Sequence, residues 1–129
     1  MRRMSLGLCV LVIGSLVLAA GCKPNLRVAG PVTKTRVGSD VGVKAVIENA
    51  DRDDAEDAFI VSFRRLEPTV GPWQDVPFAH GLAKHKKREI KALVPNVLPH
   101  KKIIIVVDRG DAVRESNEGD NERTFQAPP

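Results

Sequence analysis

The sequence predicts an all-β protein, an antiparallel sandwich of two sheets with about seven strands. Three observations indicate this fold. Apolar and polar residues alternate in short segments, ten Gly and nine Pro separate those segments, and no helical pattern ten residues long lies between them. With 129 residues, 43% of them apolar and 28% charged, the chain has the size and composition of one globular domain.

The strands are predicted from side-chain periodicity. Residues 41–47 and 59–63 alternate with a period of two, and residues 89–94 do the same until Pro95 removes a backbone donor. Residues 103–107 form a continuous β-branched run, which is typical of a central strand covered on both faces. The shorter candidate strands are residues 26–29, 32–37, 73–78 and 123–126. Short strands at this spacing favour two stacked antiparallel sheets.

The N-terminus has the order of a secretory signal. Arg2 and Arg3 precede an uncharged apolar run over residues 6–18, and three small residues then lead to Cys22. Ala19-Ala20-Gly21-Cys22 resembles the bacterial lipobox, which implies a diacylglycerol on the Cys22 thiol and removal of residues 1–21 as a lipoprotein signal peptide. The alternative is a retained transmembrane helix over residues 4–22.

The lipobox resemblance also implies a location. Lys23 stands where enteric-type sorting reads Asp as a retention signal, so we expect a lipid-anchored protein of the cell envelope, at the outer membrane. Two or three acyl chains hold a protein on a bilayer far longer than one chain. Residues 22–129 then form the mature domain, which is long enough to bury one modest core.

The mature domain is nearly balanced in charge. Without residues 1–21, 18 Lys and Arg remain against 16 Asp and Glu, a net charge of +2. We predict a basic patch and expect the acidic segment, residues 48–57, at the opposite end of the molecule. The basic patch consists of Lys84, Lys86, Lys87 and Arg88. It suits lipid headgroups, an anionic glycan or an acidic protein, or is simply a solvated turn; nucleic acid is not an expected partner.

The most distinctive motif lies between the last two predicted strands. Val107-Asp108 is followed by Val113, then Glu115-Ser116-Asn117-Glu118, then Asn121. This pattern resembles the CARDB family, the cell adhesion related domain found in bacteria, with Asp111 and Asp120 as departures. Pro24-Asn25-Leu26, Val46 to Asn49 and Leu82-Ala83-Lys84 extend the resemblance upstream. It implies an immunoglobulin-like sandwich over residues 22–129, an adhesion-type function and no catalytic activity.

The loop motif has a structural interpretation and a functional one. Its members are Asp108, Asp111, Val113, Glu115, Asn117, Glu118 and Asn121. Short polar side chains accept bonds from nearby backbone donors and tolerate left-handed conformations, while Val113 holds the loop to the core. The alternative is a calcium site built from the clustered carboxylates. Because their spacing is not that of a helix-loop-helix calcium loop, we assign no metal site and expect no cofactor.

The residues do not suggest an enzyme. His80, His85 and His100 lie in turn-like contexts and are expected at the surface, and no serine has the glycines of a nucleophile elbow. Trp73 is expected as a core plug, with a sugar-stacking platform as the alternative.

We therefore expect a lipid-anchored binding module of the cell envelope without catalytic activity. Its partner would be an envelope protein or glycan that the sequence does not identify. The alternative is a structural accessory subunit that braces an envelope protein complex through protein contacts.

Overall fold

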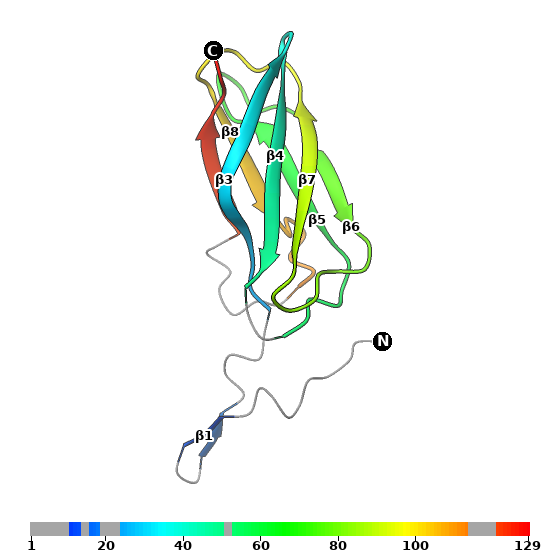
Figure 1. The fold of residues 1–129 in the computed structure, drawn as a ribbon. Helices are drawn as coiled ribbons and strands as arrows, with labels where there is room; N and C mark the ends of the chain where they lie inside the picture. The colour runs from blue at the N-terminus through cyan, green and yellow to red at the C-terminus, as the bar shows by residue number, and fades with distance from the viewer. Residues whose placement is uncertain (1–10, 14–15, 19–23, 51–52, 114–120) are drawn as a thin grey trace.

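A computed structural model describes residues 11–13, 16–18, 24–50, 53–113 and 121–129 (Figure 1). Seven of its strands form two antiparallel sheets that face each other, and the described residues contain no helix. The first sheet has the order β3-β4-β7, with β3 Leu26–Val37, β4 Asp40–Asn49 and β7 Lys87–Val94. The second has the order β6-β5-β8-β9, with β6 Gln74–Phe78, β5 Phe59–Arg65, β8 Lys102–Val107 and β9 Glu122–Gln126. The predicted all-β sandwich is confirmed.

Two short strands precede the sandwich. β1 Leu11–Ile13 pairs with β2 Leu16–Leu18 in an antiparallel hairpin. A search of the described residues for a helix long and apolar enough to cross a membrane found none. Cys22 lies outside the described residues, so its lipidation stays a prediction.

Alternate side chains of the strands meet between the two sheets and form the core. β4 buries every second residue from Val41 to Asn49, and β8 buries Ile103, Ile105 and Val107. The rings of Phe59 and Phe78, whose centroids are 4.6 Å apart, stack in the same cluster. Period-two alternation thus gives each sheet one apolar face, and burial of these faces drives the layers together.

The prediction of two separate strands at the start of the sandwich is wrong. Residues 26–29 and 32–37, predicted as separate strands, form one strand with a register shift between Ala29 and Thr33. Pro31 has no N–H for the ladder, and Gly30 has a positive φ of 66°, so the chain bulges locally. Pairing with β4 then resumes in a register shifted by two residues, so the same face of β3 continues to point toward the core.

The predicted central position of β8 is confirmed, because β8 lies between β5 and β9. Its predicted coverage on both faces is wrong. Ile103, Ile105 and Val107 are buried, but Ile104 and Val106 are only half-buried. These two residues point to the outer face of the sheet, beside the polar residues of β5 with which they are in register. No third layer covers that face among the described residues.

β7 begins at Lys87, two residues earlier than predicted, because its first residues pair with the end of β4. Arg27, Glu48 and Lys87 form one cross-strand row on the outer face of the first sheet. The Glu48 carboxylate lies 2.8 Å from the Arg27 guanidinium and 3.5 Å from Lys87 Nζ. The hydrogen bond from Arg27, with smaller contributions from the charges of Arg27 and Lys87, lowers the pKa of Glu48 below its usual 4.5 even though burial opposes the shift.

The pKa of Glu48 predicts how stability depends on pH. A carboxyl whose pKa is lower in the folded state stabilises it at neutral pH, and that contribution disappears as pH falls through the folded pKa. We expect Glu48→Gln to reduce the free energy of unfolding by up to about 1 kcal/mol at pH 7. The difference from wild type should shrink in urea titrations performed below pH 4.5. The matched control is Glu89→Gln at an exposed residue of β7; an equal, pH-independent loss in both variants would contradict the assignment.

Candidate functional site at the two ends of the sandwich

The functional residues are grouped at the two ends of the sandwich. We call the end where β3 begins the base, and the opposite end the apex; in Figure 1 the base is below and the apex above. The β4–β5, β6–β7 and β8–β9 connections lie at the base. The other three connections and the C-terminal residues lie at the apex. The base is also where the chain enters from Cys22, four residues before Leu26.

Asn49 holds the base together. Its side chain is buried at the end of β4, where its Nδ2 donates to Asp53 O at 2.8 Å and to Leu82 O at 3.0 Å. Its Oδ1 accepts from the backbone N–H of Asn25 at 3.1 Å. Its own backbone exchanges bonds with the segment from His85 to Lys86. One amide side chain therefore joins the incoming chain to the two loops beside it.

All four residues of the basic patch are exposed at the base. Lys87 and Arg88 belong to β7, where Arg88 lies over the Phe78 ring at 4.4 Å and Lys87 pairs with Glu48. Lys84 and Lys86 lie in the preceding turn. Two strand residues and two turn residues thus share one surface at the base.

The predicted charge separation is wrong. The acidic segment lies beside the basic patch: the backbone N–H of Lys84 donates to the Asp54 carboxylate at 2.8 Å, and Ala55 pairs with Leu82. Antiparallel topology explains this, because β4 ends and β7 begins at the same end of the sandwich. The acidic and basic segments therefore meet at the base instead of occupying opposite ends.

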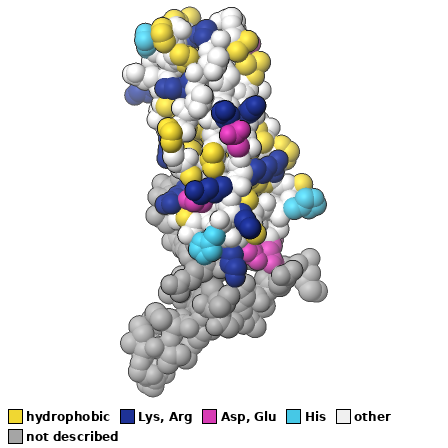
Figure 2. All heavy atoms as spheres, viewed as in Figure 1, with side chains coloured by type: hydrophobic (Ala, Val, Ile, Leu, Met, Phe, Trp, Pro, Cys, Tyr) yellow, Lys and Arg dark blue, Asp and Glu magenta, His cyan; other side chains and the backbone are white. Residues whose placement is uncertain are grey.

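Basic side chains instead dominate the apical half, between the middle of each sheet and the apex. The basic residues there are Lys34, Arg36, Lys44, Arg64, Arg65, Lys91, Lys101 and Lys102, and the acidic ones are Asp40 and Glu67. Figure 2 shows Lys and Arg side chains spread along the molecule rather than gathered in one loop. The field of the domain is thus positive toward the apex.

Asp108 organises the described part of the loop motif. It is buried directly after β8 with a positive φ of 56°, and its two carboxylate oxygens accept from the backbone N–H groups of Ala112 and Val113, each at 2.8 Å. Burial raises the pKa of Asp108, and these two hydrogen bonds oppose the rise. Val113 is buried and Asp111 is exposed with a φ of 53°. This agrees with the structural interpretation of the loop.

The rest of the loop motif is only partly described. Asn121 is buried, and its carbonyl accepts from the N–H of Val107 at 2.7 Å. Glu115, Asn117 and Glu118 lie outside the described residues. In the part of the chain that is described, no three His, Cys, Asp or Glu residues are grouped so that they could hold a metal ion. His80, His85 and His100 are exposed, as predicted.

A polar network covers the outer face of the second sheet and includes Trp73. Arg109, in the loop after β8, donates to Ser62 Oγ at 3.1 Å and contacts the Asp75 carboxylate at 3.4 Å. The guanidinium groups of Arg64 and Arg109 lie 3.8 and 4.7 Å from the centroid of the Trp73 ring. Trp73 is half-buried on this outer face, so its predicted role as a core plug is wrong.

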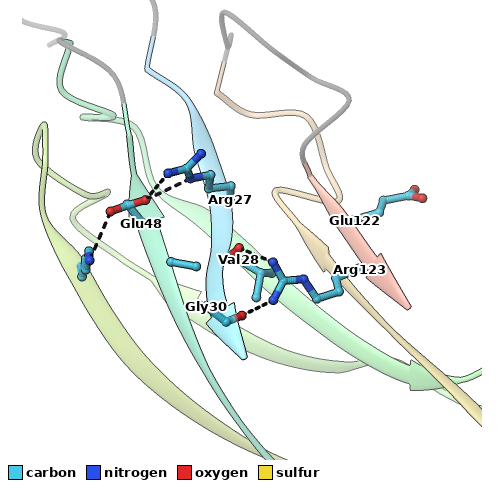
Figure 3. Close-up of a pocket in the computed structure, with 8 residues that line it drawn as sticks. Arg27, Val28, Gly30, Glu48, Glu122 and Arg123 are labelled. Carbon is cyan, nitrogen blue, oxygen red and sulfur yellow. Dashed lines mark hydrogen bonds and ion pairs between the residues drawn. The ribbon is translucent and has the colours of Figure 1, made fainter. Parts of the chain in front are cut away.

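A groove of about 580 Å³ lies between β3 and β9 (Figure 3). The Arg123 guanidinium enters it from β9 and donates to the carbonyls of Val28, at 2.8 Å, and Gly30, which the bulge in β3 leaves available. Glu48 lines the other side, where it is held by Arg27 and Lys87. Its lowered pKa makes it a carboxylate at neutral pH rather than a proton donor.

Two arginines fix the apical loops. Arg36 of β3 donates to the carbonyls of Ser39, Val97 and Pro128. Arg65 of β5 donates to the carbonyls of Thr69, Pro95 and Asn96. The most exposed large hydrophobic residues all lie at or near this end: Val37, Val70, Leu93 and Leu98 are each at least half exposed. The apex thus combines ordered backbone with exposed apolar side chains.

Comparisons with known proteins give a match in structure but not in sequence. A scan against protein-family models and a search of curated proteins found no match. A CARDB domain from Pyrococcus furiosus, solved in complex with di-metal ions, matches with a TM-score of 0.61 and 18% identity, covering 83% of this chain and 94% of that one. β-Glucosidase 3B from Thermotoga neapolitana, in complex with α-D-glucose, reaches a TM-score of 0.43 and 10% identity over 16% of its length, which is too distant for any inference.

The strand order and the two facing sheets place the chain among immunoglobulin-like β-sandwiches. More narrowly, its fold is that of a CARDB domain, as the resemblance in the loop motif implied. At this level of identity the comparison establishes the fold alone.

Several important residues were not predicted as site residues. Asn49 had one available signal, because it is a polar residue that ends an alternating strand in the family-like stretch Val46 to Asn49. Arg36, Arg65 and Arg123 had none, because most of their acceptor carbonyls are 30 or more residues away in the sequence.

Asn49 provides a test of the base. Asn49→Ala would leave the carbonyls of Asp53 and Leu82 and the N–H of Asn25 without this partner. We expect a loss of roughly 2–4 kcal/mol in the free energy of unfolding, measured by urea titration. The control is Thr124→Ala, at an exposed residue of β9. Asn96→Ala would not serve as a control, because Asn96 has a positive φ of 54°. Equal stability of Asn49→Ala and wild type would contradict the role of Asn49.

Asp108 provides a test of the loop. Asp108→Asn replaces one acceptor oxygen by an NH₂ group, which would face a backbone N–H donor. We expect a loss of about 1–3 kcal/mol in urea titrations, while Asp111→Asn, at an exposed site with a similar φ, should stay within about 0.5 kcal/mol of wild type. A larger effect at Asp111 than at Asp108 would reverse the assignment.

Proposed function

We propose that the chain is a lipid-anchored binding module of the cell envelope, of the adhesion type and without catalytic activity. The observation that carries the proposal is where the chain enters the fold. Because β3 starts at the base only four residues after Cys22, an acylated Cys22 would hold the base next to the bilayer. The ordered apex would then point away from the membrane, toward partners.

The chemistry of the described residues supports binding rather than catalysis. Glu48 and Asp108, whose pKa values are displaced, are each engaged by neighbouring residues of the fold. Binding sites on loops held by a rigid sandwich are common in this architecture. The fixed apical loops fit that pattern, since ordering them in advance reduces the entropic cost of binding.

The second candidate is a structural accessory subunit that braces an envelope protein complex. The four strand edges of the sandwich favour it, because an edge can pair with a strand of another protein. Mild cross-linking in cells, followed by purification, separates the candidates. Recovery of one protein in stoichiometric amount indicates the accessory role, whereas retention on glycan columns indicates a glycan-binding module.

A metal is not part of the proposal. The Pyrococcus furiosus domain was solved with di-metal ions, but the described residues of this chain do not fit such a centre. The two Asp108 oxygens hold the backbone N–H groups of Ala112 and Val113, so this carboxylate already has a structural role in the loop. The calcium hypothesis also involves Glu115, Glu118 and Asp120, which lie outside the described residues.

Lipidation can be tested with the two cysteines of the chain. Cells expressing the full chain are labelled with a radioactive fatty acid. We expect label on wild type and on Cys9→Ser, and none on Cys22→Ser, because the thiol of Cys22 is the proposed acceptor. Membrane fractionation of the same cells should place wild type in the outer membrane. Label that persists in Cys22→Ser would refute the anchoring.

A further inference from the structure

The sandwich has four edge strands, and three of them are protected against pairing with another chain. β3 carries Pro31 and a bulge, and β6 has five residues including Pro77. β9 also has five residues, and its Arg123 side chain extends across to β3. Proline, bulges and short length are the usual devices that keep an edge from pairing.

β7 lacks these devices. It has eight residues, contains no proline, and pairs with β4 without a register shift. Within the described chain, the backbone hydrogen bonds outside the ladders do not join β7 to β6, its neighbour in the other sheet. β7 is therefore a long and regular edge that carries charged side chains but neither a proline nor a bulge.

Two of those charges lie on the outer face without an ion pair in the described structure. Glu89 and Lys91 are exposed, two residues apart, and so point to the same side of the sheet. Lys91 lies directly opposite Lys44 of β4. Like charges in this position destabilise a sheet, so an acidic group on the free side of Lys91 would relieve the repulsion.

We propose that β7 pairs antiparallel with β7 of a second copy of this chain, with Ile90 opposite Ile90 of the second copy. The inference rests on the proposed function. In this register Glu89 faces Lys91 of the second copy, and Lys91 faces its Glu89. Each copy thus supplies the acidic group that the Lys44–Lys91 row of the other lacks, and the two sheets join into one of six strands.

The side chains of β7 select this register. When β7 pairs antiparallel with β7 of a second copy, two registers pair seven of its eight residues and keep the core-facing side chains of both copies on the same side of the joined sheet. The register that we do not propose places Lys91 opposite Lys91 of the second copy. Parallel pairing in register would place every charged residue beside the same residue of the second copy. In the proposed register no like charges are opposed. Lys87 also faces Leu93 of the second copy, where its methylene chain can cover an apolar side chain that is 50% exposed.

Antiparallel pairing of β7 makes this a contact between copies anchored in two membranes that face each other. β7 runs from the base to the apex, so antiparallel pairing places the bases of the two copies at opposite ends of the pair. Anchors at Cys22 would then leave in opposite directions. The pair joins two membranes and does not form between copies anchored side by side in one membrane.

Vesicle clustering tests the proposal with the full lipidated chain, extracted from cell membranes and inserted into lipid vesicles. Clustering is measured by dynamic light scattering. Wild-type vesicles should cluster, and high salt should weaken clustering because the register depends on exposed charges. Glu89→Lys and Lys91→Glu should each weaken it roughly tenfold or more, since each places two like-charge pairs in the interface.

Mixing the two variants is the decisive step. Glu89→Lys vesicles combined with Lys91→Glu vesicles should recover clustering, because each variant restores opposite charges across the contact. The matched control is Glu122→Lys, which makes the same charge change on the edge strand β9 and should cluster like wild type. Wild-type clustering without recovery in the mixture would overturn the register.

The remaining outcomes separate this inference from the proposed function. If wild-type vesicles carry fatty-acid-labelled protein and do not cluster, the second copy is not the occupant of β7, while the anchoring stands. If Glu89→Lys instead abolishes cross-linking to a different envelope protein, the edge serves that partner and the self-pairing is overturned. If Cys22 is not acylated, the proposed function fails independently, and pairing of the full chain in detergent solution, measured by sedimentation, still tests the register.

Discussion

The structure depends on the contact between the apolar inner faces of the two sheets. Because side chains alternate along a strand, Val41, Val43 and Ile47 of β4 reach Ile103 and the other buried residues of β8 only in one register. A shift of one residue would turn these side chains to solvent. Antiparallel pairing within each sheet sets the direction of every strand, and strand direction decides which connections meet at the base and which at the apex.

A sandwich closed by apolar contact still has to satisfy backbone carbonyls at its ends and at the β3 bulge. Here single polar side chains provide the donors. Asn49 does so at the base, Arg36 and Arg65 at the apex, and Arg123 beside the bulge. A guanidinium carries five N–H donors, so one arginine can bind carbonyls from several loops at once. The two ends are therefore ordered by long-range hydrogen bonds, although they contain little regular structure.

Sequence reasoning predicted the fold because strands depend on local periodicity. The alternation in β4 and the β-branched run of β8 were sufficient to place both strands, and the position of Asp108 and Val113 followed from local turn chemistry. It failed where distant segments meet. The acidic segment was expected far from Lys84, yet antiparallel topology brings Asp54 to its backbone. Trp73 was expected in the core, but pairing of the neighbouring residues of β6 with β5 directs that end of the strand to the outer face, where two arginines cover the ring.

The charges of β7 illustrate how one feature can serve both solubility and recognition. Lys87, Arg88 and Lys91 discourage indiscriminate pairing at a regular edge, since most registers with another basic strand would oppose like charges. Glu89 changes this balance for one partner only, a strand that carries Lys and Glu in the reverse order, which an antiparallel copy of β7 provides. Charges of this kind contribute little affinity individually but discriminate strongly between registers. A weak contact of this kind gains strength only when many anchored copies face one another, because each further pair then forms at high effective concentration. Under the proposed anchoring, the short stretch of sequence between Cys22 and β3 would also set the direction in which β7 is presented.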